Sequence, residues 1–118
     1  MHLEIHMLTP EEVAEKHLTA VKGGDPFLMA EDYAQDALLV RGEDVFAGKE
    51  EILNYFAGVP NRMGSGVIKF MKLEVDGSSV SFFWEITDDK KVTSGKDVMI
   101  IRNGLIQHQE VTLLTEDF

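Results

Sequence analysis

The chain has 118 residues, 21 of them acidic and 11 basic, which gives a formal net charge of −10 at neutral pH. Such acidity disfavours nucleic acid and anionic membranes as partners, because both bind through a basic surface. The sequence contains no cysteine, so disulfides, thiolate metal sites and cysteine nucleophiles are excluded. It has no signal-peptide pattern and no apolar run long enough to cross a membrane, and we therefore expect a cytoplasmic protein. Its length and its 44% hydrophobic content predict one domain, residues 1–118, with one core.

A first helix is predicted from Thr9 to about Lys22. Thr9 is a favourable N-cap, Pro10 suits the first turn, and Glu12 completes a capping box. Gly23-Gly24 ends the helix. The apolar stripe of this helix consists of Val13, Ala14, His17, Leu18 and Val21. The histidine of the stripe is therefore expected on the buried side.

Shorter elements follow in the middle of the chain. Asp25-Pro26 begins a second helix that extends to about Tyr33, and Ala37–Arg41 is predicted to be a short buried strand. A polar tip at Gly42–Asp44 precedes a third helix, Gly48–Ala57. The inner side of the third helix is expected to carry Ile52, Leu53, Tyr55 and Phe56. Glycines and a proline between residues 58 and 66 then break the chain.

Four strands joined by three tight turns are predicted between about Val67 and Leu114. The strongest turn signal is Asn103-Gly104, which is typical of a hairpin with a two-residue loop. The pairs that follow from the three turns are Arg102–Leu105, Met99–His108, Asp97–Glu110, Phe82–Asp97, Trp84–Gly95, Val75–Val80 and Leu73–Phe82. Because side chains alternate along a strand, these pairs assign every residue to one of two faces.

The inner face collects mostly apolar residues around three ionisable ones. Its members are Val67, Met71, Leu73, Val75, Val80, Phe82, Trp84, Ile86, Asp97, Met99, Ile101, Ile106, His108 and Glu110. Ionisable groups on an apolar face indicate either a ligand pocket or an error in the assigned register. The outer face carries several large apolar residues, among them Ile68, Phe70, Phe83, Val98 and Ile100. That composition predicts a symmetric homodimer through the outer face, and a scattered, solvated surface is the alternative.

The order of these elements resembles the NTF2-like superfamily. The strings that carry the resemblance are AVKGGDPFLMAEDYAQDALLV, FAGKEEILNYFAG and KDVMIIRNGLIQHQEVTLL. The resemblance implies an α+β cone, in which three N-terminal helices pack on a curved, mainly antiparallel sheet in the order α-α-β-α-β-β-β-β.

Within this superfamily the chain is most similar to the SnoaL-like and ketosteroid-isomerase-like branch, from about Thr9 to Leu114. In that branch a first-helix tyrosine and a protonated aspartic acid on a late strand donate hydrogen bonds to the substrate carbonyl. These two positions fall on His17 and Asp97. The position of the branch's catalytic base falls on Arg41, so the resemblance does not imply steroid double-bond isomerisation by the family mechanism.

Asp97 and His17 are the candidate catalytic residues. Asp97 is expected beside Phe82 and Met99, where desolvation favours its neutral form and makes it a hydrogen-bond donor. The alternative is a carboxylate held for structural reasons by His17, His108 or a backbone amide. A histidine with an ordinary pKa of about 6.5 suits proton transfer, although His17 could also be a satisfied core residue.

The other candidates are expected to bind the ligand. His108 and Glu110 complete a polar cluster, and Arg41 holds an anionic group of the ligand. The apolar ligand-binding candidates are Trp84, Tyr55, Phe56, Phe82 and Met99, with plain core packing as the alternative. Two histidines and two carboxylates also suit zinc or iron, but no metal-binding motif is present. We expect no metal and no cofactor.

Two functions are consistent with these features. The first is a pocket that binds a small hydrophobic carbonyl or hydroxyl compound and catalyses a cofactor-free isomerisation, cyclisation or dehydration. The second is a non-catalytic dimerisation or ligand-sensing module, which the mixed outer face favours.

Overall fold

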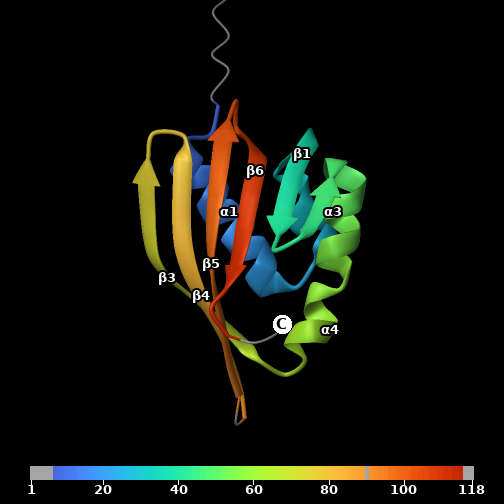
Figure 1. Cartoon of the computed structure of the whole chain (residues 1–118). Helices are drawn as coiled ribbons and strands as arrows, with labels where there is room; N and C mark the ends of the chain where they lie inside the picture. Colours follow the sequence, from blue (N-terminus) through green and yellow to red (C-terminus); the bar gives the residue numbers. More distant parts are fainter. Residues whose placement is uncertain (1–6, 90, 116–118) are drawn as a thin grey trace, which may run out of the picture.

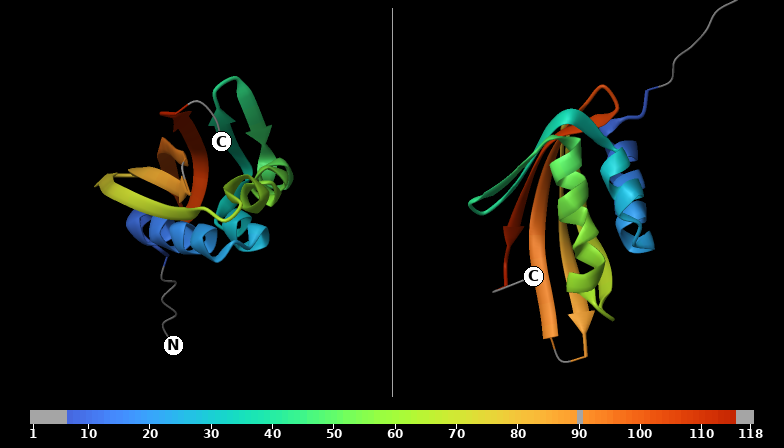
Figure 2. Two further views of the ribbon diagram at one scale, coloured as in Figure 1. Left: turned by 90° about the horizontal axis from the view of Figure 1, so that it is seen from below. Right: turned by 90° about the vertical axis from the view of Figure 1, so that its right-hand side faces the viewer.

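The computed structural model describes residues 7–89 and 91–115, which form an α+β fold (Figure 1). Six strands form one curved, open sheet in the order β2-β1-β6-β5-β4-β3, and the helices lie on its concave side (Figures 1 and 2). The helices are α1 (Pro10–Gly23), α2 (Pro26–Glu31), α3 (Gly48–Ala57) and α4 (Val59–Met63). The strands are β1 (Tyr33–Arg41), β2 (Asp44–Ala47), β3 (Val67–Asp76), β4 (Ser79–Asp88), β5 (Lys91–Arg102) and β6 (Leu105–Leu113). Neighbouring strands are antiparallel except β1 and β6, which are parallel. Within the ranges that the structure describes, no helix has the length and apolar character that crossing a membrane requires.

The capping pattern read from the sequence is present at the start of α1. The Glu12 amide donates to Thr9 Oγ1 over 3.2 Å, and the Thr9 amide donates to Glu12 Oε1 over 2.9 Å. Gly24 ends the helix in a left-handed conformation with a φ of 76°, which favours glycine. The helix buries Val13, Ala14, His17 and Val21, as its apolar spacing predicts.

The middle of the chain differs from the prediction. The second helix ends at Glu31, and β1 begins at Tyr33, four residues earlier than expected. The segment expected as a polar tip is the turn of a hairpin, because Arg41 pairs with Asp44 and the following residues form β2. Gly42, with a φ of 60°, permits this tight turn. The short helix α4 also lies in a segment that its glycines and proline predicted to be irregular.

The predicted register is confirmed between β4 and β5, and it is wrong over part of the pairing between β5 and β6. Between β4 and β5, Phe82 pairs with Asp97 and Trp84 with Gly95, as predicted. Between β5 and β6 the first pair, Arg102 with Leu105, is also as predicted. A β-bulge at Gln107 then shifts the register by one residue. Beyond the bulge the pairs are Ile100–His108, Met99–Gln109, Val98–Glu110 and Asp97–Val111. Every side chain of β6 after the bulge therefore lies on the face opposite to the predicted one.

A second bulge lies in β3 between Met71 and Glu74, where Lys72 has a φ of 54°. The predicted pair Val75–Val80 is present, but the pairing of Leu73 with Phe82 is not, and Phe70 pairs with Trp84. The first half of β3 consequently turns Ile68 and Phe70 inward, although both were expected on the outer face.

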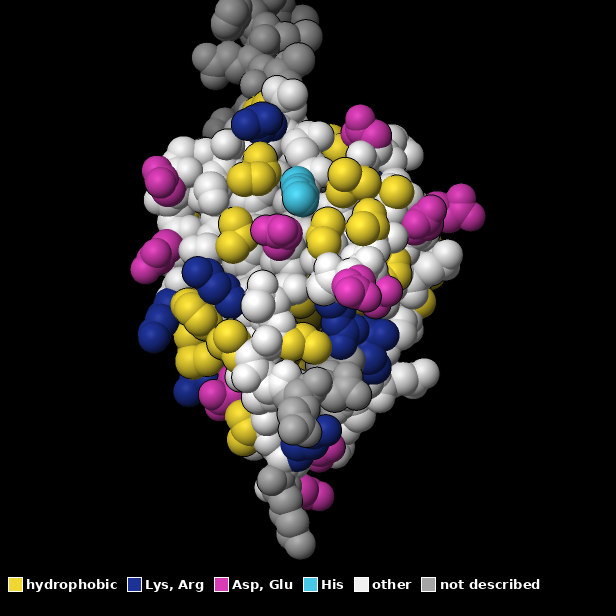
Figure 3. All heavy atoms as spheres, viewed as in Figure 1, with side chains coloured by type: hydrophobic (Ala, Val, Ile, Leu, Met, Phe, Trp, Pro, Cys, Tyr) yellow, Lys and Arg dark blue, Asp and Glu magenta, His cyan; other side chains and the backbone are white. Residues whose placement is uncertain are grey.

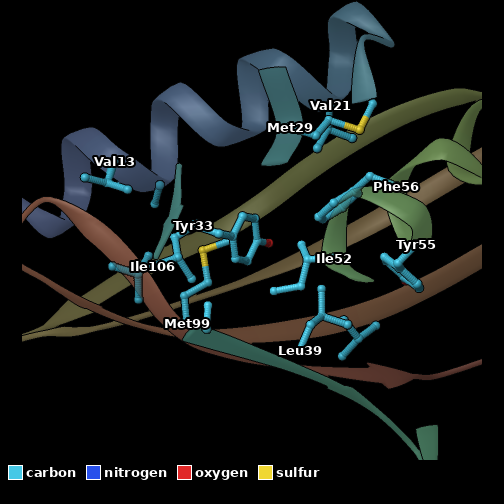
Figure 4. Close-up of a cluster of buried hydrophobic side chains, with 14 of the residues drawn as sticks. Val13, Val21, Met29, Tyr33, Leu39, Ile52, Tyr55, Phe56, Met99 and Ile106 are labelled. Carbon is cyan, nitrogen blue, oxygen red and sulfur yellow. The ribbon is translucent and has the colours of Figure 1, made fainter. Parts of the chain in front are cut away.

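The core lies between the helices and the concave face of the sheet. Tyr33 is 1% exposed and lies at the centre of a cluster of buried side chains from α1, α3 and the strands (Figure 4). Its ring packs edge-on against His17, with 5.4 Å between ring centroids, and tilted against Phe56, with 5.7 Å. These aromatic contacts fix the first helix and the third helix against β1.

Candidate functional site

A small cavity lies between α1, α3 and the concave face of the sheet. Its volume is about 50 Å³. It is lined by His17, Leu18, Val21, Tyr55, Phe56, Val59, Ile68, Phe70, Phe82, Trp84, Ile86, Asp97, Gln109 and Val111. Leu18, Ile68 and Phe70 are partly exposed, so the open side of the cavity lies between α1 and β3. The structure thus places six of the predicted site residues around one cavity: Asp97, His17, Trp84, Tyr55, Phe56 and Phe82.

Asp97 is the buried acid of this cavity, and both of its carboxylate oxygens accept hydrogen bonds. Trp84 Nε1 donates to Oδ1 over 2.9 Å, and Gln109 Nε2 donates to Oδ2 over 2.6 Å. Burial raises the pKa of Asp97 from 3.8 to about 6, while the hydrogen bonds from Trp84 and Gln109 oppose the rise. The group therefore changes charge near neutral pH, and its neutral form is a potential proton donor.

Gln109 links Asp97 to Tyr33. The Tyr33 hydroxyl donates to Gln109 Oε1, while the amide of the same side chain donates to Asp97. Burial raises the pKa of Tyr33 well above its usual value, so the hydroxyl stays protonated. Tyr33 and Gln109 were not predicted as site residues. Gln109 faces the cavity because the bulge at Gln107 shifts the register of β6 by one residue. No sequence signal shows where that bulge lies, so Gln109 could not be identified in advance.

Trp84 reaches Asp97 because the residue opposite it is a glycine. A Cβ atom on Gly95 would lie 2.3 Å from Trp84 Cζ2 and 2.5 Å from Cε2. The indole therefore lies directly over the backbone of β5, which brings its Nε1 to the carboxylate two residues farther along.

His17 lies on the opposite wall of the cavity, on α1. Its Nδ1 lies 3.0 Å from the carbonyl oxygen of Met29. Complete burial lowers the pKa of His17 to about 4, against a smaller opposing effect of the Met29 hydrogen bond. At neutral pH the imidazole is therefore uncharged, donates from Nδ1 to Met29, and has Nε2 as its acceptor atom.

Four predicted ligand-binding residues do not line the cavity. His108 and Glu110 were expected on the inner face, and the bulge at Gln107 places both on the outer face instead. Met99 is fully buried in the core, apart from the cavity. Arg41 ends β1 and lines a separate polar cleft. Within residues 7–89 and 91–115 no three histidine or acidic side chains are grouped so that they could hold a metal ion.

The outer face of the sheet carries exposed apolar side chains over β1, β2, β5 and β6 (Figure 3). Leu38 and Val45 are 41% and 55% exposed. Leu38 pairs with His108, which in turn pairs with Ile100 of β5. The Nε2 atom of His108 is buried and has no hydrogen-bond partner among the described residues.

Solved structures resemble this chain closely in fold and weakly in sequence. A ketosteroid isomerase-like protein from Kribbella flavida superimposes with a TM-score of 0.78 at 17% identity, over 92% of this chain and 79% of that protein. An NTF2-like protein of unknown function from Cytophaga hutchinsonii has a TM-score of 0.74 at 13% identity, over 94% of each chain. The chain has the NTF2-like fold. This confirms the resemblance read from the sequence and the α+β cone that it implied.

A third NTF2-like neighbour is SalBIII, an epoxide hydrolase/cyclase-like enzyme in pyran ring formation of the polyether salinomycin. It has a TM-score of 0.73 at 22% identity, over 92% of each chain. Neighbours of this fold therefore include isomerase-like and cyclase-like proteins. No protein-family model matches the sequence, and no curated protein matches it in sequence.

Proposed function

We propose that this protein binds a small hydrophobic carbonyl or hydroxyl compound and catalyses a cofactor-free proton transfer on it. The observation that carries the proposal is Asp97, a fully buried acid with a pKa of about 6 in the wall of an apolar cavity. Unpaired acids are costly to bury, and perturbed acids in cavities are more frequent at functional sites than elsewhere. Isomerisation, cyclisation and dehydration are the reactions that one such acid supports without a cofactor.

The neutral form of Asp97 is the reactive one in this proposal. When Asp97 takes up a proton, its O–H needs an acceptor, and the two groups that now contact it are both donors. A substrate oxygen in the cavity would supply that acceptor. Without substrate, Gln109 would have to rotate its amide so that Oε1 faces Asp97 and Nε2 faces Tyr33. A substrate oxygen and the rotated Gln109 amide are therefore alternative acceptors for the proton of neutral Asp97.

His17 is proposed to complete the proton transfer from the opposite wall. Its Nδ1 hydrogen bond to Met29 fixes the tautomer and leaves Nε2 as a neutral acceptor. A pKa of about 4 makes this imidazole a weak base, so it suits orienting a hydroxyl better than removing a proton from carbon.

The size of the cavity limits the substrate. A volume of about 50 Å³ holds a few water molecules, whereas a cavity of roughly 150 Å³ is needed for a benzene ring. A ring-sized substrate therefore requires movement of the partly exposed side chains at the open side, which are Leu18, Ile68 and Phe70. The small volume is also the observation that favours the second candidate, a non-catalytic dimerisation or sensing module.

An unbiased ligand search distinguishes the two candidates. Native mass spectrometry of protein purified from its own host, together with a thermal-shift screen of small apolar carbonyl compounds, should detect a bound molecule. Asp97→Asn should abolish turnover of such a compound while changing its affinity little. A protein that binds nothing in either assay would support the dimerisation module.

A further inference from the structure

Two of the three arginines of this acidic chain converge on one residue of the cavity wall, Tyr55. The Arg62 guanidinium lies over the Tyr55 ring, 5.0 Å from its centroid, and Arg62 Nη2 donates to the Tyr55 carbonyl oxygen over 3.3 Å. Burial raises the pKa of Tyr55, and the positive charges of Arg41 and Arg62 both oppose this rise. The tyrosine thus has its ring in the cavity wall and two guanidinium groups beside it.

The arginines also face a second cleft that adjoins the cavity. This cleft, of about 750 Å³, is lined by Arg41, Gly42, Glu43, Asp44, Arg62, Val111, Thr112 and Leu113. Val111 lines both the cleft and the cavity, so the two spaces adjoin at this residue. The cleft is far larger than the cavity, which by itself is too small for a substrate of several carbon atoms.

We infer that the cleft between Arg41 and Arg62 binds the carboxylate end of an elongated substrate whose apolar end enters the cavity. This inference rests on the proposed function and narrows its substrate class to hydrophobic carboxylic acids. Guanidinium groups match the planar, two-oxygen geometry of a carboxylate and hold it by charge-assisted hydrogen bonds. A carboxylate bound there places the other end of the molecule next to Tyr55, in the wall that Asp97 shares.

The acidic residues of the cleft set the selectivity of this site. Glu43 and Asp44 lie exposed on the β1–β2 hairpin and line the same cleft. Their two negative charges offset the two positive charges of Arg41 and Arg62, so a dianion adds twice the uncompensated charge that a single carboxylate adds. Monocarboxylates are therefore the expected ligands.

The test uses the full chain and a matched pair of probes, hexanoate and its neutral amide, titrated in NMR chemical-shift experiments. Hexanoate should bind at least about tenfold more tightly than hexanamide, which corresponds to about 1.4 kcal/mol. Arg41→Gln and Arg62→Gln should each reduce that preference severalfold while leaving hexanamide binding unchanged. Arg102→Gln, which changes the third arginine at the far β5–β6 turn, is the matched control and should keep the preference.

Lys22 provides a second control because its ammonium lies over Phe70, 5.7 Å from the ring centroid, at the open side of the cavity between α1 and β3. A loss of the preference in Lys22→Gln alone would overturn the inference, since the carboxylate would then enter between α1 and β3. Equal binding of the acid and the amide would overturn it as well but leave the proposed pocket standing. No binding of either probe would count against both proposals.

Discussion

Trp84, the one tryptophan of the sequence, donates its indole N–H to Asp97 Oδ1 over 2.9 Å. The acid that we propose as the proton donor is therefore in direct contact with an intrinsic fluorophore. Because ionisation of Asp97 places a negative charge beside the indole, the emission of Trp84 should report the charge of the acid without any label.

The first prediction is a fluorescence titration. Between pH 4 and pH 8 the emission of Trp84 should change with a midpoint near the Asp97 pKa of about 6. Asp97→Asn should remove the transition, because it replaces the ionisable carboxylate that accepts the indole hydrogen bond with an amide that does not ionise. A transition that persists in Asp97→Asn would assign the change to another group and contradict the role given to Asp97.

The second prediction concerns stability against pH, where Asp97 and His17 act in opposite directions. A pKa raised from 3.8 to about 6 means that Asp97 contributes stability below pH 4, and that this contribution is lost as the pH rises to about 6. A pKa lowered from 6.5 to about 4 means that His17 contributes stability above pH 6.5, and that this is lost as the pH falls to about 4. Each contribution is on the order of 3 kcal/mol, so the two nearly cancel in the wild type.

Single substitutions should separate the pH-dependent contributions of Asp97 and His17 to the free energy of unfolding. Relative to the wild type, Asp97→Asn should gain free energy of unfolding at pH 7 and lose this advantage towards pH 4. His17→Gln, which keeps a donor for the Met29 carbonyl, should instead gain relative to the wild type as the pH falls from 6.5 to 4. Urea denaturation at several pH values measures both, and parallel curves for the two variants would contradict the assigned pKa directions.

The third prediction tests the link between Asp97 and Tyr33. Gln109→Leu removes the donor to Asp97 Oδ2 and the acceptor for the Tyr33 hydroxyl, while Asp97 Oδ1 keeps its hydrogen bond from Trp84. We expect a loss of about 2–4 kcal/mol in the free energy of unfolding and a further rise in the Asp97 pKa. Gln107→Leu is the matched control, since the half-buried Gln107 side chain donates to the Arg102 carbonyl and to no other group among residues 7–89 and 91–115. Its expected cost is below about 1 kcal/mol. Equal costs for the two variants would show that the buried chain has no special importance.

The fourth prediction concerns the contact of Trp84 with the backbone. Gly95→Ala would place a methyl group 2.3 Å from the indole, so the ring must move and its hydrogen bond to Asp97 must lengthen or break. We expect a destabilisation of about 1–3 kcal/mol and a blue or red shift of the Trp84 emission. Gly23→Ala, where a methyl group meets no atom within 4 Å, is the control and should change neither quantity. An unshifted emission in Gly95→Ala would mean that the backbone of β5 moves to accommodate the methyl group and the indole keeps its position.

The first and third helices and the β4–β5 register could be predicted because their signals are local. A capping box, paired glycines and a turn without a bulge each depend on a few neighbouring residues, and all lie where the sequence places them. The β1–β2 hairpin was missed because its turn is short and its second strand is only four residues long.

The part of the site on β6 could not be predicted, because a β-bulge has no comparable local signal. One extra residue at Gln107 exchanges the two faces of the strand and brings Gln109 to Asp97 in place of Glu110. Asp97 and His17 were placed correctly because neither depends on that register, although their chemical roles stay predictions. The cytoplasmic location and the absence of a cofactor also stay predictions.

The last prediction concerns the homodimer expected through the outer face of the sheet. The bulge makes this face less apolar than predicted, since it adds His108 and Glu110 to it. Leu38 and Val45 of the first hairpin extend its apolar area. Leu38→Glu should convert a dimer into a monomer in sedimentation equilibrium, because it places a charge in the apolar face, opposite His108, and removes apolar contact area. Phe27→Glu replaces a side chain that is 72% exposed on α2, away from the sheet face, and should leave the association unchanged. A monomeric wild type, or a dimer that Phe27→Glu breaks and Leu38→Glu does not, would remove the outer face as the interface.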